Sequence, residues 1–463
     1  MTLRGTRWNK IIRFRLRLQD PAIILFTGLL LRELFSFWTA HPYDFEVWLR
    51  NAVYVSRGIS PYSFMDPIPG LSFSDQNQML PSVGYPPLWS LMLAELYRLF
   101  ILLPGDNRFV LYFLLKQPTI LGDVFLGYVL YRAVTQWGGT IESAHRILGF
   151  WMLFPYPILI SAIWGQFDAL VAFLWITSLL VARPVRRSVL DGLAILLKLF
   201  PLIFIPYHLL REKGTAKLRQ LVSLGIPVVF TAAAFYLGGW GFANFRDTMV
   251  YAAHGAPQGM SILAVLFSHG LLDHFPGIVA AFGAASWLWV PAVTVSGVYA
   301  ARRFPRNSRF DLVQALLFIM VVFFLFRVQV NEQYLMYLLP LLLLDLVLWH
   351  PERKGLFHMT WVIGLVYLLF NNDFLIRFFG PIFPATLDWS YNLDNNSSFG
   401  PVRTVVLLAV AIMFAVHLVQ LALVLIDGRW NPDPWLLRAF RRLNFAIKTH
   451  VSSPDRVSDG PRR

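Results

Sequence analysis

Two carboxylates follow the first long apolar block of the chain. The run His-Pro-Tyr-Asp-Phe-Glu at residues 41–46 contains Asp44 and Glu46. A carboxylate beside a membrane can act as general base on a hydroxyl group, or it can cap the helix that follows. On a helix the two side chains diverge by about 200°, so at most one of them faces a given cleft. Position alone favours capping, but the pattern of the whole chain leads us to expect Asp44 to be a base.

Ionisable residues also lie inside later apolar blocks. Lys116 and Asp123 share one helical face, about 10 Å apart along the axis. Charges at membrane depth are costly, so they indicate either a structural charge pair or a site for an anion such as phosphate. Lys198 is the only cation at the apex of the hairpin predicted below, where it could meet an anionic headgroup.

Two polar clusters stand at block ends. Gly165-Gln166-Phe167-Asp168 begins a helix, where Asp168 could instead be its N-cap. The second cluster lies between two strongly apolar blocks and suits a sugar or a phosphate, although an ordinary loop could hold it too; its candidate ligands are Arg327, Asn331, Glu332 and Gln333. No metal-ligand spacing, nucleotide fingerprint, phosphate loop or serine triad is present, so we expect no metal and no cofactor.

The composition predicts the scaffold that must position these residues. Of 463 residues, 57% are hydrophobic and 14% charged, and the apolar residues fall in blocks of about 20. We therefore predict an all-α, polytopic integral membrane protein of roughly 11–13 transmembrane or re-entrant helices. The net charge of +14 sits in short runs between blocks, which indicates topology and not nucleic-acid binding. Without cysteine, disulfides and thiol chemistry are excluded.

Charge places both termini in the cytoplasm. Residues 1–19 carry six basic residues and no acid before the first helix at about 21–39, so Asp44 is expected outside. An interfacial helix and a Pro/Gly-rich loop should follow, ending at Tyr85-Pro86-Pro87-Leu88. Later crossings, with outer loops at 241–276 and 371–403, are expected at about 221–241, 277–300, 310–326, 335–349, 357–370 and 404–426.

Between residues 85 and 187, the number of predicted membrane crossings conflicts with the side of the membrane that the charges indicate. Four blocks (87–104, 109–131, 147–164 and 169–182) would return the chain to the outside, yet Arg183, Arg186 and Arg187 require the inside. One block must not cross fully; 147–164, interrupted by two prolines, is preferred, and 87–104 is the alternative. Block 188–210 has basic residues on both flanks and is predicted to be re-entrant, turning near Lys198.

The domain organisation is expected to be simple. Residues 1–440 should form one membrane domain, with a core module at about 20–260 and further helices at about 261–426. Residues 441–463 are polar and predict a disordered cytoplasmic tail.

With these residues assembled, the chain resembles the glycosyltransferase-C superfamily of multi-helix enzymes that use polyprenyl-phosphate sugars. The resemblance is to dolichyl-phosphate-dependent glucosyltransferases of the endoplasmic reticulum, the GPI mannosyltransferase catalytic subunit and prokaryotic polyprenol-phosphate-mannose-dependent enzymes. It rests on an acid after the first helix, Tyr-Pro-Pro-Leu, a basic residue with Asp123, the glycine-glutamine turn, Lys198 with Pro201, and Val330-Asn331-Glu332-Gln333. In the last motif the family's histidine and lysine are replaced by Asn331 and Gln333.

The resemblance implies inverting transfer of a hexose, mannose first, from a polyprenyl or dolichyl phosphate to a lipid-linked or membrane-proximal acceptor outside the cytoplasm. Asp44 would be the base, and Lys116, Lys198 or Arg327 would stabilise the leaving phosphate. The membrane would be a prokaryotic plasma membrane or the endoplasmic reticulum. A transporter or lipid flippase, which also uses broken helices and buried charges, and a non-catalytic subunit of a membrane assembly are the alternatives.

Overall fold

The computed structural model describes residues 20–73, 83–211, 214–254, 257–268, 277, 286–304 and 308–427. The predicted tail lies outside these residues. The described elements that the text uses are, in chain order, α2 (Pro21–Ser36), α3 (Asp44–Ser56), α4 (Leu88–Leu102), α5 (Arg108–Gln136), α6 (Ile141–Leu153), α7 (Pro155–Ile158), η1 (Leu159–Trp164), α8 (Asp168–Leu180), α9 (Pro184–Leu197), η2 (Phe200–Phe204), α10 (Ile205–Arg211), α11 (Thr215–Gly238), α12 (Phe242–His254), β1 (Gln258–Gly259), α13 (Ile262–Ser268), α15 (Trp289–Arg303), α16 (Arg309–Phe326), β2 (Gln329–Val330), η3 (Glu332–Tyr334), α17 (Leu335–Leu348), α18 (Lys354–Asn371), η5 (Asp373–Phe379), α19 (Ala385–Asp394) and α20 (Phe399–Asp427).

The protein is an all-α, polytopic integral membrane protein, as predicted. Among the described residues, four helices are long and apolar enough to cross a membrane, namely α5, the 221–238 part of α11, α16 and α20. The number rises to six if two bent helix pairs each count as one span. The expected 11–13 transmembrane or re-entrant helices include short and broken helices, so that number stays a prediction.

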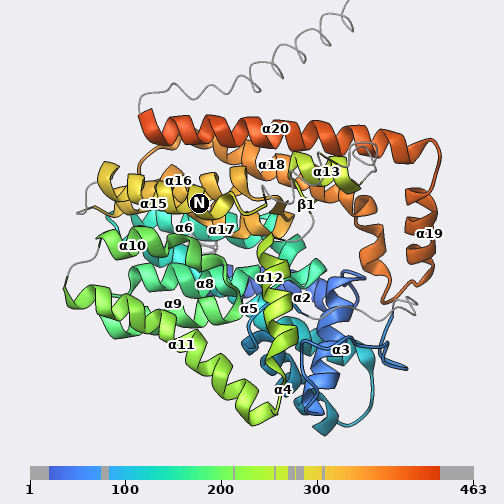
Figure 1. The fold of residues 1–463 in the computed structure, drawn as a ribbon. Helices are drawn as coiled ribbons and strands as arrows, with labels where there is room; N and C mark the ends of the chain where they lie inside the picture. Colours follow the sequence, from blue (N-terminus) through green and yellow to red (C-terminus); the bar gives the residue numbers. More distant parts are fainter. Residues whose placement is uncertain are drawn as a thin grey trace, which may run out of the picture.

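The helices pack in layers around α5 and α17 (Figure 1). The long C-terminal helix α20 lies along one side of the molecule and packs on α16 and α18. Helix α5 contacts α2, α6 and α8, so it connects the N-terminal part to the middle of the chain. Helices α3 and α4 pack together beside one end of α5.

Helix α3 is present where an interfacial helix was predicted, but it is more buried than one apolar face would require. Ten of its 13 residues are buried. Glu46 and Arg50 form an ion pair with both side chains fully buried. Arg50 also donates to the Met65 carbonyl, and Glu46 accepts from the Phe73 amide. The loop after α3 therefore covers the helix's polar side.

Both predicted helix breaks are confirmed. The pair of α6 with α7 and η1 bends by 43° next to Pro155, which has no amide hydrogen to continue the ladder. Helix α9 ends at Leu197, Lys198 is extended, and η2 begins at Phe200. Each break places polar side chains beside the interior of the helix bundle.

A short parallel pair, β1 with β2, joins two loops that are about 70 residues apart in the chain. The Met260 amide donates to the Val330 carbonyl, and the Ser261 hydroxyl donates to the Val328 carbonyl. Gly259 has φ of 71°, and a Cβ at this position would collide with the Val330 carbonyl. Glycine is required there for both reasons.

Gly259→Ala should destabilise the protein by about 2 kcal/mol, because the new Cβ meets rigid backbone at a positive φ. Thermal unfolding of the purified protein in detergent measures this. Gly149→Ala in α6 is the control, since a Cβ there meets nothing within 4 Å. Equal unfolding temperatures for the two variants would contradict the prediction.

Candidate active site

Asp44 is the first residue of α3, and its side chain does not cap the helix. The indole Nε1 of Trp164 and the amide Nε2 of Gln166 each donate to Asp44 Oδ2 at 2.7 Å. The side chain is 24% exposed, so it is both held in place and reachable. The alternative that Asp44 serves as an N-cap is therefore wrong.

The turn at Gly165 explains how two residues of one segment reach the same oxygen. Gly165 has φ of 90° and ends the π-helix η1, so Trp164 and Gln166 flank a left-handed turn. A Cβ on Gly165 would lie 3.0 Å from the Phe45 ring of α3. The predicted glycine-glutamine turn thus packs directly against the start of α3.

Polar side chains on one face of α5 donate hydrogen bonds to the backbone around this turn. The Lys116 ammonium donates to the Ala162 carbonyl at 2.8 Å and to the Thr39 carbonyl. Thr119 donates to the Ser161 carbonyl at 2.9 Å. The Ala162 and Ser161 carbonyls lie at the C-terminal end of η1, where no backbone amide of the helix reaches them, and α5 side chains donate to them instead. Lys116 therefore contacts backbone on both sides of the site.

Asp123 continues the same face but belongs to a separate cluster. Its carboxylate pairs with the Arg32 guanidinium of α2 at 2.7 Å, with both side chains fully buried. It also accepts from the Trp151 indole at 2.9 Å and the Ser161 hydroxyl at 2.7 Å. Lys116 and Asp123 do not pair with each other; Arg32 is the partner, and its place in the first apolar block was the signal for it.

Lys198 lies in an aromatic enclosure. Its ammonium donates to Asp168 Oδ1 at 2.7 Å, so Asp168 also pairs with a cation and caps no helix. The ammonium lies 5.0 Å from the ring centre of Tyr85, 5.4 Å from that of Phe167 and 4.8 Å from that of Tyr334. Such faces stabilise a cation, and the Lys198 side chain is buried among them.

Tyr85 connects the Lys198 pair to Asp44. Burial raises the pKa of the Tyr85 phenol, the Lys198 charge opposes that rise, and Asp168 and Asp44 add to it. Tyr85 is therefore an electrostatic neighbour of both groups. The structure brings Asp44, Gln166, Tyr85, Lys198 and Asp168 into one region.

The residues of the 327–334 cluster do not all belong to one site. The Arg327 guanidinium donates to the Ala253 carbonyl at 2.7 Å and to Gln329, beneath the Trp289 ring, and so serves the loop joined by β1 and β2. Glu332 accepts from the Asn371 amide at 2.8 Å and is an electrostatic neighbour of Asp44. Burial raises the pKa of Glu332. Gln333 is also buried, and Asn331 is half-buried.

Residues 371–379, which we call the 371–379 turn, complete the surroundings of Asp44. His41 stacks on Trp164 with ring centres 4.6 Å apart, and its Nε2 lies 3.3 Å from Asn372 Oδ1. Arg377 donates to the same oxygen at 2.9 Å. Sequence reasoning missed these residues; the polar run Asn371-Asn372-Asp373 at a block end was the signal available.

Carboxylates near the site differ in their partners. Glu46, Asp123 and Asp168 each have a cation at 2.7–3.2 Å. Asp44 and Glu332 are held by neutral indole and amide groups, and the one basic side chain within 4 Å of Asp44 in the described part of the chain is His41, at 3.8 Å. Burial lowers the pKa of His41 to about 4, so this imidazole is neutral at pH 7. Asp44 is thus not paired with a charged side chain within 4 Å in the described part of the chain.

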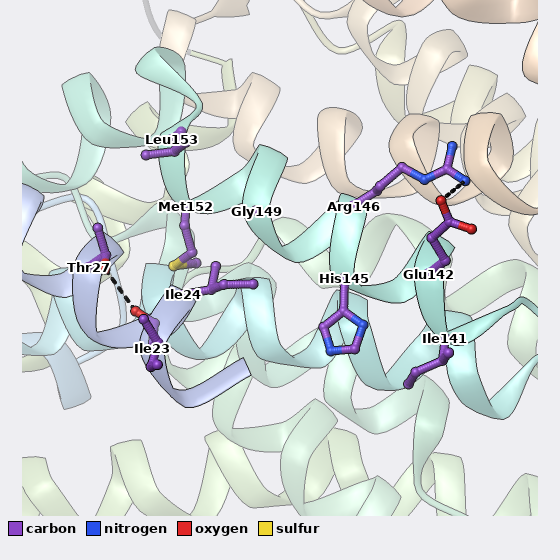
Figure 2. A pocket seen from close by; sticks show the side chains of 10 residues that line it. All are labelled: Ile23, Ile24, Thr27, Ile141, Glu142, His145, Arg146, Gly149, Met152 and Leu153. Atoms are coloured by element: carbon purple, nitrogen blue, oxygen red, sulfur yellow. Dashed lines mark hydrogen bonds and ion pairs between the residues drawn. The ribbon is translucent and has the colours of Figure 1, made fainter. Parts of the chain in front are cut away.

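Two other features do not join the site. Within the described ranges, no group of three His, Asp or Glu side chains could hold a metal ion. A groove of about 510 Å³ lies between α2 and α6, lined by apolar side chains with Glu142, His145 and Arg146 towards one end (Figure 2). None of the candidate site residues lines it.

Comparison with known proteins identifies the family. The model of glycosyltransferase family 87 matches residues 84–328, more than half of the chain. The chain belongs to glycosyltransferase family 87. No curated protein matches it. The matched part of this family 87 member includes Tyr85, Gln166, Asp168 and Lys198, whereas Asp44, Glu332 and the 371–379 turn lie outside it.

The buried imidazole of His41 should make the protein less stable in acid. The pKa of His41 is about 4 in the folded chain and 6.5 ordinarily, so the unfolded chain takes up the extra proton first as pH falls. Stability is lost between pH 6.5 and about 4. His41→Gln should flatten this part of the unfolding-temperature curve; parallel curves for the two proteins would contradict the assignment.

Proposed function

We propose that this family 87 member is a glycosyltransferase-C-like enzyme that transfers a hexose, mannose first, from a polyprenyl or dolichyl phosphate. The acceptor is a lipid-linked or membrane-proximal glycan, and the configuration at the sugar carbon is inverted. The active site lies on the extracytoplasmic side, and both termini are cytoplasmic. The donor class follows from the resemblance described above and from the lack of a nucleotide-binding motif.

The observation that carries this proposal is the state of Asp44. Its carboxylate is partly exposed, is fixed by two neutral donors on one oxygen, and has no lysine or arginine side chain within 4 Å in the described part of the chain. A general base needs this combination, since it must hold its geometry and still accept a proton from the acceptor hydroxyl. Its neighbours Glu46 and Asp168 are already paired with cations.

Among the three cations expected to face the leaving phosphate, Lys198 is preferred because Tyr85 links it to Asp44, although its ammonium is itself paired with Asp168. Lys116 is occupied by two backbone carbonyls, and Arg327 contacts the Ala253 carbonyl and Gln329. Lys198 shares Tyr85 as an electrostatic neighbour with Asp44. In an inverting displacement the base and the leaving group lie on opposite faces of the sugar, so base and cation must flank one space. Tyr85, between the two groups, would line that space.

Asp44→Asn should lower sugar transfer by at least about 100-fold, because the amide cannot take the acceptor proton while its size is kept. Transfer from polyprenyl-phosphate-mannose by the purified protein is the measurement. Asp66→Asn, at an exposed aspartate of the loop after α3, is the control and should keep wild-type activity. Near-full activity of the Asp44 variant would overturn the catalytic assignment.

Lys198→Met combined with Asp168→Asn should also lower kcat by about 100-fold or more, since the ammonium that meets the leaving phosphate is lost while no buried carboxylate is left unpaired. Single-turnover transfer measures the step. Arg327→Gln is the comparison and should cost less than the double variant. An equal loss in both would show that Lys198 does not face the phosphate.

A further inference from the structure

The 371–379 turn has a strained backbone held against the site. Asp373, Phe374 and Leu375 have φ of 49°, 55° and 68°, a left-handed run without glycine. Each such residue is strained and persists only where surrounding contacts fix it. Here the Ala40 amide donates to the Phe378 carbonyl at 2.8 Å, and the Phe378 ring lies beside both His41 and Trp164. The strain is therefore located next to Asp44.

A chain of hydrogen bonds runs from the turn to Asp44. The amide of Asp44 donates to His41 Nδ1 at 3.1 Å, so in the neutral imidazole the proton is on Nε2. Nε2 then donates to Asn372 Oδ1, which also accepts from Arg377. The position of the α3 start is thereby tied to the Arg377 guanidinium.

The charge of Arg377 also reaches the site. Its side chain is 21% exposed, lies 3.7 Å from Asp373, and is attracted by Glu332 and Asp44. Its Nε, although buried, has no hydrogen-bond acceptor among the described residues. Among the carboxylates it faces, Asp44 and Glu332 are the two that are otherwise held by neutral groups. The cation placed there lowers the pKa of Glu332, which burial raises.

We propose that Arg377 is a positioning residue for sugar transfer, which holds Asp44 through Asn372 and His41 and places a positive charge beside Glu332. This inference rests on the proposed function. It assigns a role to the 371–379 turn, which lies outside the part of the chain that matches the family model. Residues near the C-terminal helices would therefore complete the site.

Arg403 of α20 provides a matched control. It donates to the Asn371 carbonyl at 3.0 Å, where Arg377 donates at 2.7 Å, and it lies 3.5 Å from Asp373. The electrostatic neighbours of Arg403 are Asp373, Arg377 and Tyr367. Neither Asp44 nor Glu332 is among them. Loss of Arg403 therefore weakens the anchoring of the turn without removing the cation near Asp44.

The kinetic experiment uses full-length protein with polyprenyl-phosphate-mannose. Arg377→Gln should lower kcat by about 10–100-fold with KM within about threefold, and Arg377→Lys should recover part of the loss. Arg403→Gln should stay within about threefold of wild type. Equal losses in Arg377→Gln and Arg403→Gln, or no loss in either, would overturn the positioning role.

The pH profile separates positioning from simple anchoring. Glu332 faces Asn371 and Arg377 of the turn, Asp44 of α3, and the phenols of Tyr156 and Tyr367. Removing the Arg377 charge raises the pKa of Glu332 further, so the acid limb of the kcat profile should move to higher pH in Arg377→Gln alone. If the acid limb of Arg377→Gln lies at the same pH as that of the wild type, the electrostatic part of the proposal is wrong.

A double-mutant cycle of Arg377→Gln and Glu332→Gln on unfolding temperature tests the electrostatic coupling of the two residues without turnover. Non-additive effects support the coupling, and additive effects overturn it. If the wild-type protein transfers no sugar while the cycle shows coupling, the proposed function fails and the Arg377–Glu332 coupling stands.

Discussion

The structure around Asp44 depends on the satisfaction of backbone carbonyls at a broken helix. The π-helix η1 exposes carbonyls inside the bundle, and a membrane interior offers no water to bind them. Lys116 and Thr119, which lie three residues apart on α5, donate to Ala162 and Ser161 of this segment. Ser161 in turn donates to Asp123, which Arg32 neutralises. The buried charges of α5 are thus the means by which an irregular segment stays ordered and presents Trp164 and Gln166 to one oxygen.

Charge pairing divides the carboxylates of this region into two kinds. Those with a cation in contact, such as Glu46 and Asp168, stabilise the packing of α3 and the break at Lys198. Those held by neutral donors, Asp44 and Glu332, lie where the family 87 region meets the C-terminal helices. A buried ion pair is weak evidence for function, because ion pairs also form for structural reasons alone. A carboxylate that remains without such a partner is better evidence.

The sequence was a good guide to helices and a partial one to contacts. Apolar block lengths predicted an all-α membrane protein, and prolines with Lys198 predicted the two breaks, because these features act locally. The pairing of Asp123 with Arg32 and not with Lys116 depends on which helices lie side by side, 91 residues apart in the chain. The approach of Asn372 and Arg377 to His41 spans more than 330 residues and depends on a left-handed turn without glycine, which sequence patterns do not indicate. Whether Asp44 is catalytic stays a prediction.

The two hydrogen bonds to Asp44 also have a stereochemical consequence. Both Trp164 and Gln166 donate to Oδ2, so the two oxygens of the carboxylate are not equivalent. The oxygen that receives both donors is the weaker proton acceptor, and the other is the one with which an incoming hydroxyl would align. A sugar ring carries several hydroxyl groups in fixed directions, and only one of them can lie along that line in a given pose. The Gly165 turn would then contribute to the choice of glycosidic linkage. It would do so indirectly, because it places the Trp164 and Gln166 side chains that orient the Asp44 carboxylate.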